Sequence, residues 1–180
     1  MARQAHLIGS IGLANAEVAM ITAAEILGPC CTRIPDGETG RRGYWIRWQQ
    51  STFDNCEHLE MEVIDQKLPG FKDSVQRPFY KIRQGINPSN LDLGELGYAE
   101  EATTSYKLFS EIVDEGKIGP DVRFQVSIPT PMALVCGFVF APDQLKVEPA
   151  IEQAMARDIS RIQAEIPTNR LSIQWDVCFE

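Results

Sequence analysis

The chain has 180 residues, of which 44% are hydrophobic and 23% charged, and a formal net charge of -8 at pH 7. We predict one globular domain over residues 1–180, because the composition shows none of the biases of disordered, collagen-like or disulfide-scaffold chains. The acidic balance argues against nucleic acid as a partner, since a surface that follows phosphates needs a basic face.

No stretch approaches eighteen consecutive apolar residues, and the first ten residues lack the apolar region of a secretory signal. We therefore expect no membrane partner and no secretion. The cysteines are odd in number and scattered, which favours reduced thiols in the cytoplasm over a disulfide framework. They are Cys30, Cys31, Cys56, Cys136 and Cys178.

Two β-strand and α-helix units open the chain. Residues 6–11 (HLIGSI) form a short strand-like run, and the Ala-rich residues 13–28 favour a helix that stops at Gly28 and Pro29. Residues 31–36 predict the second strand, and residues 41–53 the helix that follows it.

The pattern weakens over residues 54–90, where two strand-like runs lie between prolines and glycines. We interpret this stretch as an inserted hairpin region. Beyond it, helical spacing of apolar residues predicts helices over residues 96–116 and 147–166, and alternation predicts strands over residues 123–131 and 171–177. The connection between residues 132 and 146 has no clear pattern. Strands separated by long helices indicate a parallel sheet with right-handed crossovers.

Polar residues alternate with the bulkier apolar ones in the predicted strands. Because successive side chains in a strand point to opposite faces, we expect the polar set to converge on one face near the carboxyl ends of the strands. The set is Ser10, Gln125, Ser127, Gln174 and Asp176.

Residues 31–49 (CTRIPDGETGRRGYWIRWQ) join a strand end to a charged glycine-rich turn and an aromatic segment. Asp36 and Glu38 could act as a general acid and base or hold a substrate amine, or they could simply pair with nearby arginines. Arg41 is a candidate clamp for a carboxylate or phosphate, because its planar fork matches an oxyanion pair. Trp45 could line the substrate site, although core packing explains an indole there as well.

Asp176 lies at a strand end among apolar neighbours, where a carboxylate needs a partner to stay charged. We therefore predict that it is catalytic, together with Asp36 and Glu38. Gln125 and Gln174 are expected to hydrogen-bond in the same cavity. His6 and His58, by contrast, fit structural and surface roles.

Four segments resemble proteins of the cobalamin-independent methionine synthase and uroporphyrinogen decarboxylase superfamily, in the N-terminal half of their barrel. The segments are the IGS of residues 8–10, the DGETG block, FQVSIPTP and the terminal IQWD. The resemblance implies a (β/α)8 barrel with the site at the strand carboxyl ends, of which 180 residues make about half. In that family the IGS segment (here Ile8, Gly9 and Ser10) holds the amino-acid part of homocysteine, and the acid of the last strand (here Asp176) binds its amine.

The resemblance implies an enzyme that acts on a small carboxylate- or thiol-bearing substrate and is completed by a second copy or a complementary half-barrel. The zinc of the family has no ligand set in this chain, whose two histidines form no His-x-Cys pair, so no metal site is predicted. The alternatives are a metal-free lyase, decarboxylase or cyclase on the same scaffold, or a non-catalytic binding module.

Overall fold

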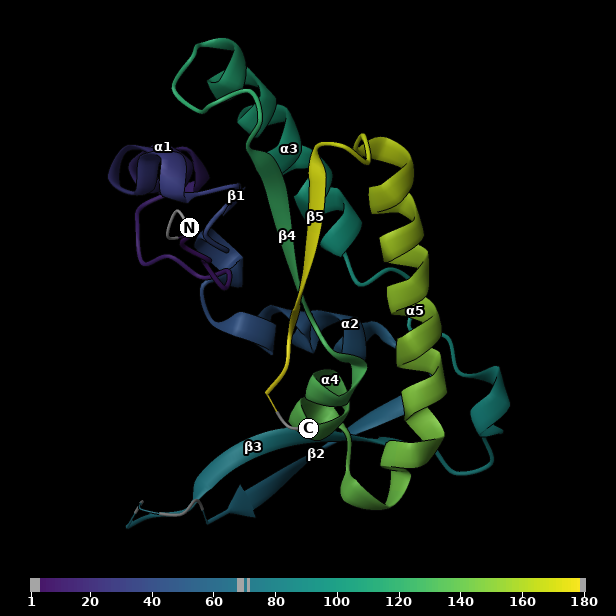
Figure 1. Ribbon diagram of the computed structural model, residues 1–180. Helices are drawn as coiled ribbons and strands as arrows, with labels where there is room; N and C mark the ends of the chain where they lie inside the picture. The colour runs from purple at the N-terminus through teal and green to yellow at the C-terminus, as the bar shows by residue number, and fades with distance from the viewer. Residues whose placement is uncertain (1–3, 68–69, 71, 179–180) are drawn as a thin grey trace.

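The computed structural model describes residues 4–67, 70 and 72–178. At its centre lies a sheet of three parallel strands in the order β1 (Arg33–Pro35), β4 (Arg123–Pro129) and β5 (Leu171–Asp176), shown in Figure 1. Every residue of β4 after Arg123 is buried. The central strand therefore has both faces covered.

Three helices pack around one core with this sheet: α1 (Ala16–Leu27), α3 (Tyr98–Asp114) and α5 (Gln144–Glu165). Phe109 of α3 and Phe124 of β4 are both buried, with ring centroids 5.4 Å apart. Offset aromatic pairs of this kind stabilise a core beyond the apolar area that they bury. They tie α3 to the middle of the sheet.

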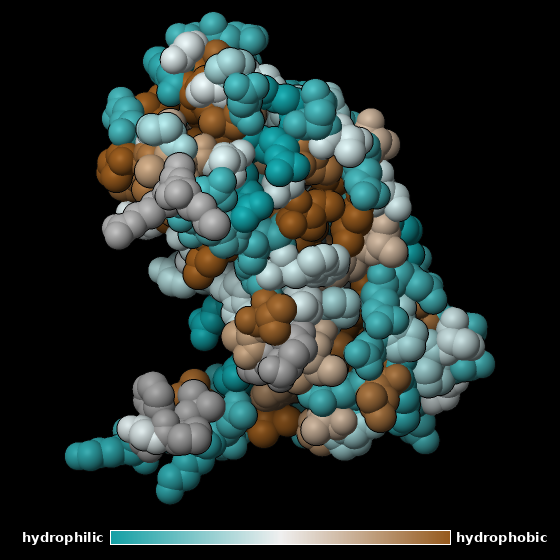
Figure 2. All heavy atoms as spheres, in the orientation of Figure 1, coloured by the Kyte–Doolittle hydropathy of each residue, from teal (hydrophilic) through white to brown (hydrophobic). Residues whose placement is uncertain are grey.

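An antiparallel hairpin forms the second sheet and projects from the body of the molecule (Figures 1 and 2). Its strands are β2 (Leu59–Gln66) and β3 (Val75–Ile82), within the predicted insertion. Tyr80 anchors the base of the hairpin against Phe53 of α2 (Gln50–Asn55), which stacks on Phe138 of α4 (Pro131–Phe138) at 4.8 Å. The remaining helical turns are 3-10 helices at Gly28–Cys30, Gly40–Arg42, Trp45–Gln49, Pro88–Asn90 and Ala141–Asp143.

The α/β class holds, but the predicted half of a TIM barrel is wrong. The parallel sheet has three strands, and residues 6–11, the expected first strand, belong to none of them; the nearest pairing is an isolated bridge between Ala5 and Cys31. This segment instead covers a face of the sheet, since Gln125 donates to the carbonyl of Leu7 at 2.7 Å. A face that carries its own chain segment does not line a barrel interior.

Two further helix predictions need correction. Residues 41–53 form two 3-10 turns before the short α2 rather than one helix, and Trp45 in this stretch has a positive φ of 55°. The unpatterned connection contains α4, which is so apolar that it has no polar face to give a period. Thr130 caps α4 by accepting from the N–H of Ala133, and Pro131 occupies its first turn.

In the part of the chain that is described, no helix has both the length and the apolar character that crossing a membrane requires.

Candidate active site

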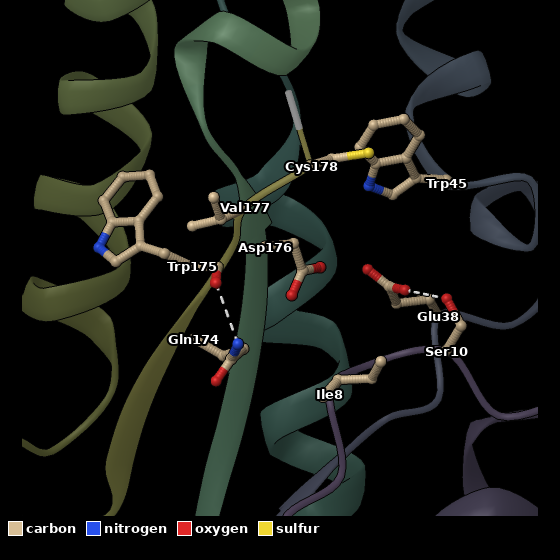
Figure 3. Close-up of a pocket in the computed structure, with 9 residues that line it drawn as sticks. All are labelled: Ile8, Ser10, Glu38, Trp45, Gln174, Trp175, Asp176, Val177 and Cys178. Atoms are coloured by element: carbon tan, nitrogen blue, oxygen red, sulfur yellow. Dashed lines mark hydrogen bonds between the residues drawn. The ribbon is translucent and has the colours of Figure 1, made fainter. Parts of the chain in front are cut away.

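A cavity of about 470 Å³ opens at the carboxyl end of β5. Figure 3 shows Asp176 from β5 and Glu38 from the turn after β1 pointing toward one another across it. Its lining is Ile8, Ser10, Glu38, Trp45, Gln174, Trp175, Asp176, Val177 and Cys178. The cavity thus combines two carboxyl groups with indole and aliphatic walls.

The turn that carries Glu38 is held close to α1. Gly37 has a φ of 80°, and a Cβ there would lie 2.8 Å from the Cβ of Ala19. Only glycine permits this approach and this backbone conformation without strain. Glu38 itself has a φ of 48°, a left-handed conformation that is costly for a residue with a side chain.

The segment around Ser10 lies directly against this turn. Ile11 donates from its backbone to the carbonyl of Gly37 at 2.9 Å, and the Ser10 hydroxyl donates to Oε2 of Glu38. Gly9 has a φ of 140°, and a Cβ there would lie 2.9 Å from Oγ of Ser127 and 3.2 Å from Oε2 of Glu38. The IGS segment therefore forms one wall of the cavity.

Gln174 connects the cavity to a histidine behind it. Nε of Arg33 donates to Nδ1 of His6 at 3.0 Å, so the hydrogen-bond network places the His6 proton on Nε2. Nε2 of His6 then donates to Oε1 of Gln174 at 2.8 Å. The orientation of the Gln174 amide is thereby set, with its nitrogen donating to the carbonyl of Trp175.

Both carboxyl groups are shifted toward the protonated form. Burial is the largest cause of the raised pKa of Glu38; the Ser10 hydrogen bond opposes it and the Asp176 charge adds to it. Burial also raises the pKa of Asp176, and a hydrogen bond from Gln174 opposes this effect. Carboxyl groups with raised pKa can hold and release a proton closer to neutral pH, which is what a general acid or base requires.

None of the nine described residues that line the cavity is a lysine, arginine or histidine. The nearby arginines are paired elsewhere: Arg41 ion-pairs with Glu101 at 2.6 Å and lies 4.9 Å over the ring of Trp48. A ligand anion would therefore meet two carboxyl groups with no lining cation to balance it.

The structure brings six of the ten predicted site residues into one cavity lining and leaves four out of it. Those inside are Ile8, Ser10, Glu38, Trp45, Gln174 and Asp176. Those outside are Gly9, whose backbone supports Glu38, and Asp36, Arg41 and Gln125, each of which is bonded to another part of the protein.

Several residues at or beneath the cavity were not singled out from the sequence. Trp175, Val177 and Cys178 line it, and their place beside Asp176 in the last strand was the available signal. Arg42 is buried against Asp36. Ser105, which also contacts Asp36, lies 69 residues further along the chain, and no sequence spacing indicates the pair.

The described residues contain no group of three or more His, Cys, Asp or Glu that could hold a metal ion. The zinc centre of the resembled family therefore does not fit this part of the chain.

No protein-family model, curated protein or solved structure matches the chain. The resemblance accordingly stands on the short segments that carry it.

Proposed function

We propose that the chain is an enzyme that binds a small amine-bearing molecule between Glu38 and Asp176 and transfers a proton to or from it. The observation that carries this proposal is a cavity with two facing carboxyl groups and no cationic residue in its lining. An ammonium group would balance the charge of one carboxylate and could donate hydrogen bonds to both carboxyl groups, and the indole of Trp45 could add a cation–π contact.

Within the predicted class of substrates, a thiol-bearing amino compound fits this cavity better than a molecule held by its carboxylate alone. Its amine would meet Glu38 and Asp176, and its apolar part would lie against Ile8 and Trp45. The carboxylate clamp predicted at Arg41 has less support, because that guanidinium is already paired with Glu101.

The chemistry that the chain's own residues support is acid–base chemistry, as in a lyase, decarboxylase or cyclase. Glu38 can give or take a proton at its carboxyl group while Ser10 fixes Oε2 and Asp176 raises the pKa. Positioned proton transfer of this kind contributes on the order of 10²–10⁴-fold to a rate.

The test is isothermal titration at pH 7.5 with homocysteine, n-butylamine and propionate as probes. We expect both amines to bind and propionate not to bind. Glu38→Gln and Asp176→Asn should each weaken amine binding by about 30-fold or more, since a desolvated charge pair that loses one partner costs about 2–5 kcal/mol.

Arg41→Gln is the matched control, because it changes a charge near the same turn but outside the cavity lining. It should bind the amines as the natural chain does. Propionate binding as strong as n-butylamine binding would reject the proposal. A bound amine with no turnover would identify a binding module instead of an enzyme.

One prediction about partners and one about cellular location belong with this proposal. We propose a homo-oligomer and a cytoplasmic protein, and the second is supported by the odd number and wide spacing of the five cysteines, which favour reduced thiols. Both stay predictions.

A further inference from the structure

A buried ion pair lies beneath the turn that carries Glu38. Asp36 is 4% exposed and Arg42 9% exposed, and Nη2 of Arg42 bonds to Oδ2 of Asp36. Oγ of Ser105 donates to the same oxygen at 2.6 Å, and Oδ1 accepts from the backbone N–H of Glu38 at 3.0 Å. Both carboxylate oxygens of Asp36 are hydrogen-bonded to other residues, and Asp36 does not line the cavity. Its role is therefore in contacts within the protein.

The ion pair joins the turn to α3. Ser105 belongs to α3, and so does Glu101, whose Oε2 lies 3.1 Å from Nε of Arg42. Burial is the largest single influence and disfavours the charge on Arg42, but Asp36, Glu101 and Glu38 together outweigh it, so the pKa of Arg42 is raised. Moving any member of a buried, hydrogen-bonded charge pair leaves a buried polar group without its partner, which is costly. Such a pair therefore holds its members in fixed positions.

What the ion pair holds is a strained residue. Glu38 has a φ of 48°, and a left-handed conformation at a residue with a side chain persists only where the surroundings fix it. The hydrogen bond from its N–H to Oδ1 of Asp36 is such a constraint. The same conformation directs the Glu38 carboxyl group to Ser10 and Asp176 (Figure 3).

We infer that Asp36 and Arg42 are positioning residues, which hold the Glu38 carboxyl group in the cavity through the hydrogen bond from the Glu38 N–H to Asp36. This inference rests on the proposed role of Glu38 and changes the role predicted for Asp36. Asp36 does not exchange protons with a substrate; it orients the residue that does.

The test is the double variant Asp36→Ala with Arg42→Gln, which removes the acceptor of the Glu38 N–H, followed by a ¹³C NMR pH titration of the Glu38 carboxyl carbon, assigned with Glu38→Gln. The Arg42 charge lowers the pKa of Glu38 and the Asp36 charge raises it, so removing both leaves burial as the main cause of the shift. If Glu38 loses its position it moves toward water, and its pKa should fall toward the ordinary value.

Arg41→Gln is the control, because it removes the outer ion pair with Glu101 and leaves the contacts of Asp36 intact. It should not change the titration. A merely structural role for the pair would lower the melting temperature of the double variant while the Glu38 titration stays unchanged, and that result would overturn the inference.

Ser105→Ala decides the matter if circular dichroism shows that the double variant does not fold. It removes one hydrogen bond to Asp36 and no charge. A fall in the pKa of Glu38 supports the inference, and an unchanged pKa rejects it. The titration needs no ligand, so a failure to bind amines would count against the proposed function and leave this measurement intact.

Discussion

At the scale of single residues, Gly9 carries a tight steric constraint at the cavity. Its φ of 140° is rarely adopted by other residues, and a Cβ would press on Ser127 and on the Glu38 carboxyl group. We expect Gly9→Ala to lower the free energy of unfolding by about 1–3 kcal/mol, measured by urea denaturation.

Gly12→Ala is the natural comparison for Gly9→Ala. A Cβ at Gly12 meets nothing within 4 Å, and its φ is not in the left-handed region. The free energy of unfolding of the Gly12→Ala variant should differ from that of the natural chain by no more than about 0.5 kcal/mol. Equal effects of the two substitutions would show that the segment around Ser10 is not held against Glu38.

Residue types and strand alternation were enough to identify the facing pair Glu38 and Asp176 as site candidates. They could not separate Glu38 from Asp36, because the two acids share a turn and differ in the partners that tertiary packing gives them. Arg42 and Ser105 saturate Asp36, and that arrangement depends on tertiary packing. Arg41 and Arg42 are adjacent in the sequence, yet Arg41 is exposed and Arg42 is buried. This difference also depends on tertiary packing.

At the scale of elements, α3 depends on α5 for its start. Gly97, which precedes α3, has no side chain to cap it, and Asp158 of α5 accepts instead from the N–H groups of Tyr98 at 2.7 Å and Ala99 at 3.4 Å. A carboxylate here meets both the free N–H groups and the positive end of the helix dipole.

We expect Asp158→Ala to destabilise the protein by about 1–2 kcal/mol, the cost of a lost helix cap, as measured by urea denaturation. Asp158→Asn keeps an oxygen that can accept from Tyr98, so it should retain most of the stability. If the alanine variant is as stable as the asparagine variant, the cap contributes nothing.

Element predictions succeeded where amphipathic periodicity or alternation was strong, as in α3, α5, β4 and β5. They failed in two physical situations. The apolar α4 has no polar face to show a period. In residues 6–11, the carbonyl groups of Leu7 and Ile8 accept hydrogen bonds from the side chains of Gln125 and Ser127 in β4 instead of pairing along a strand ladder. The half-barrel followed from treating that segment as a full strand.

At the scale of the whole molecule, buried acids make stability depend on pH. Burial is the main cause of the raised pKa of Glu38, Asp158 and Asp176, so the folded state binds these protons more tightly than the unfolded state does. Stability then falls as pH rises from the ordinary values of about 3.8–4.5 through the raised ones. At pH values below the ordinary pKa values, burying these carboxyl groups costs no stability through ionisation. At pH values above the raised pKa values, the full cost of burying the charged carboxylates is present.

Asp92 and Asp143 have the opposite sign. Hydrogen bonds lower the pKa of Asp92, whose carboxyl group is largely exposed and screened by solvent. Burial opposes the lowered pKa of Asp143, but hydrogen bonds from Lys146 and the Ile82 N–H and the nearby lysine charges together outweigh it. The variant Glu38→Gln with Asp176→Asn isolates the cavity pair. Its free energy of unfolding relative to the natural chain, from urea melts between pH 4 and 8, should rise with pH because the variant loses the penalty. A relative stability that is flat or falls with pH would mean that the folded state does not favour protonation of these carboxyl groups, and the cavity would then lack the poised acid that its chemistry needs.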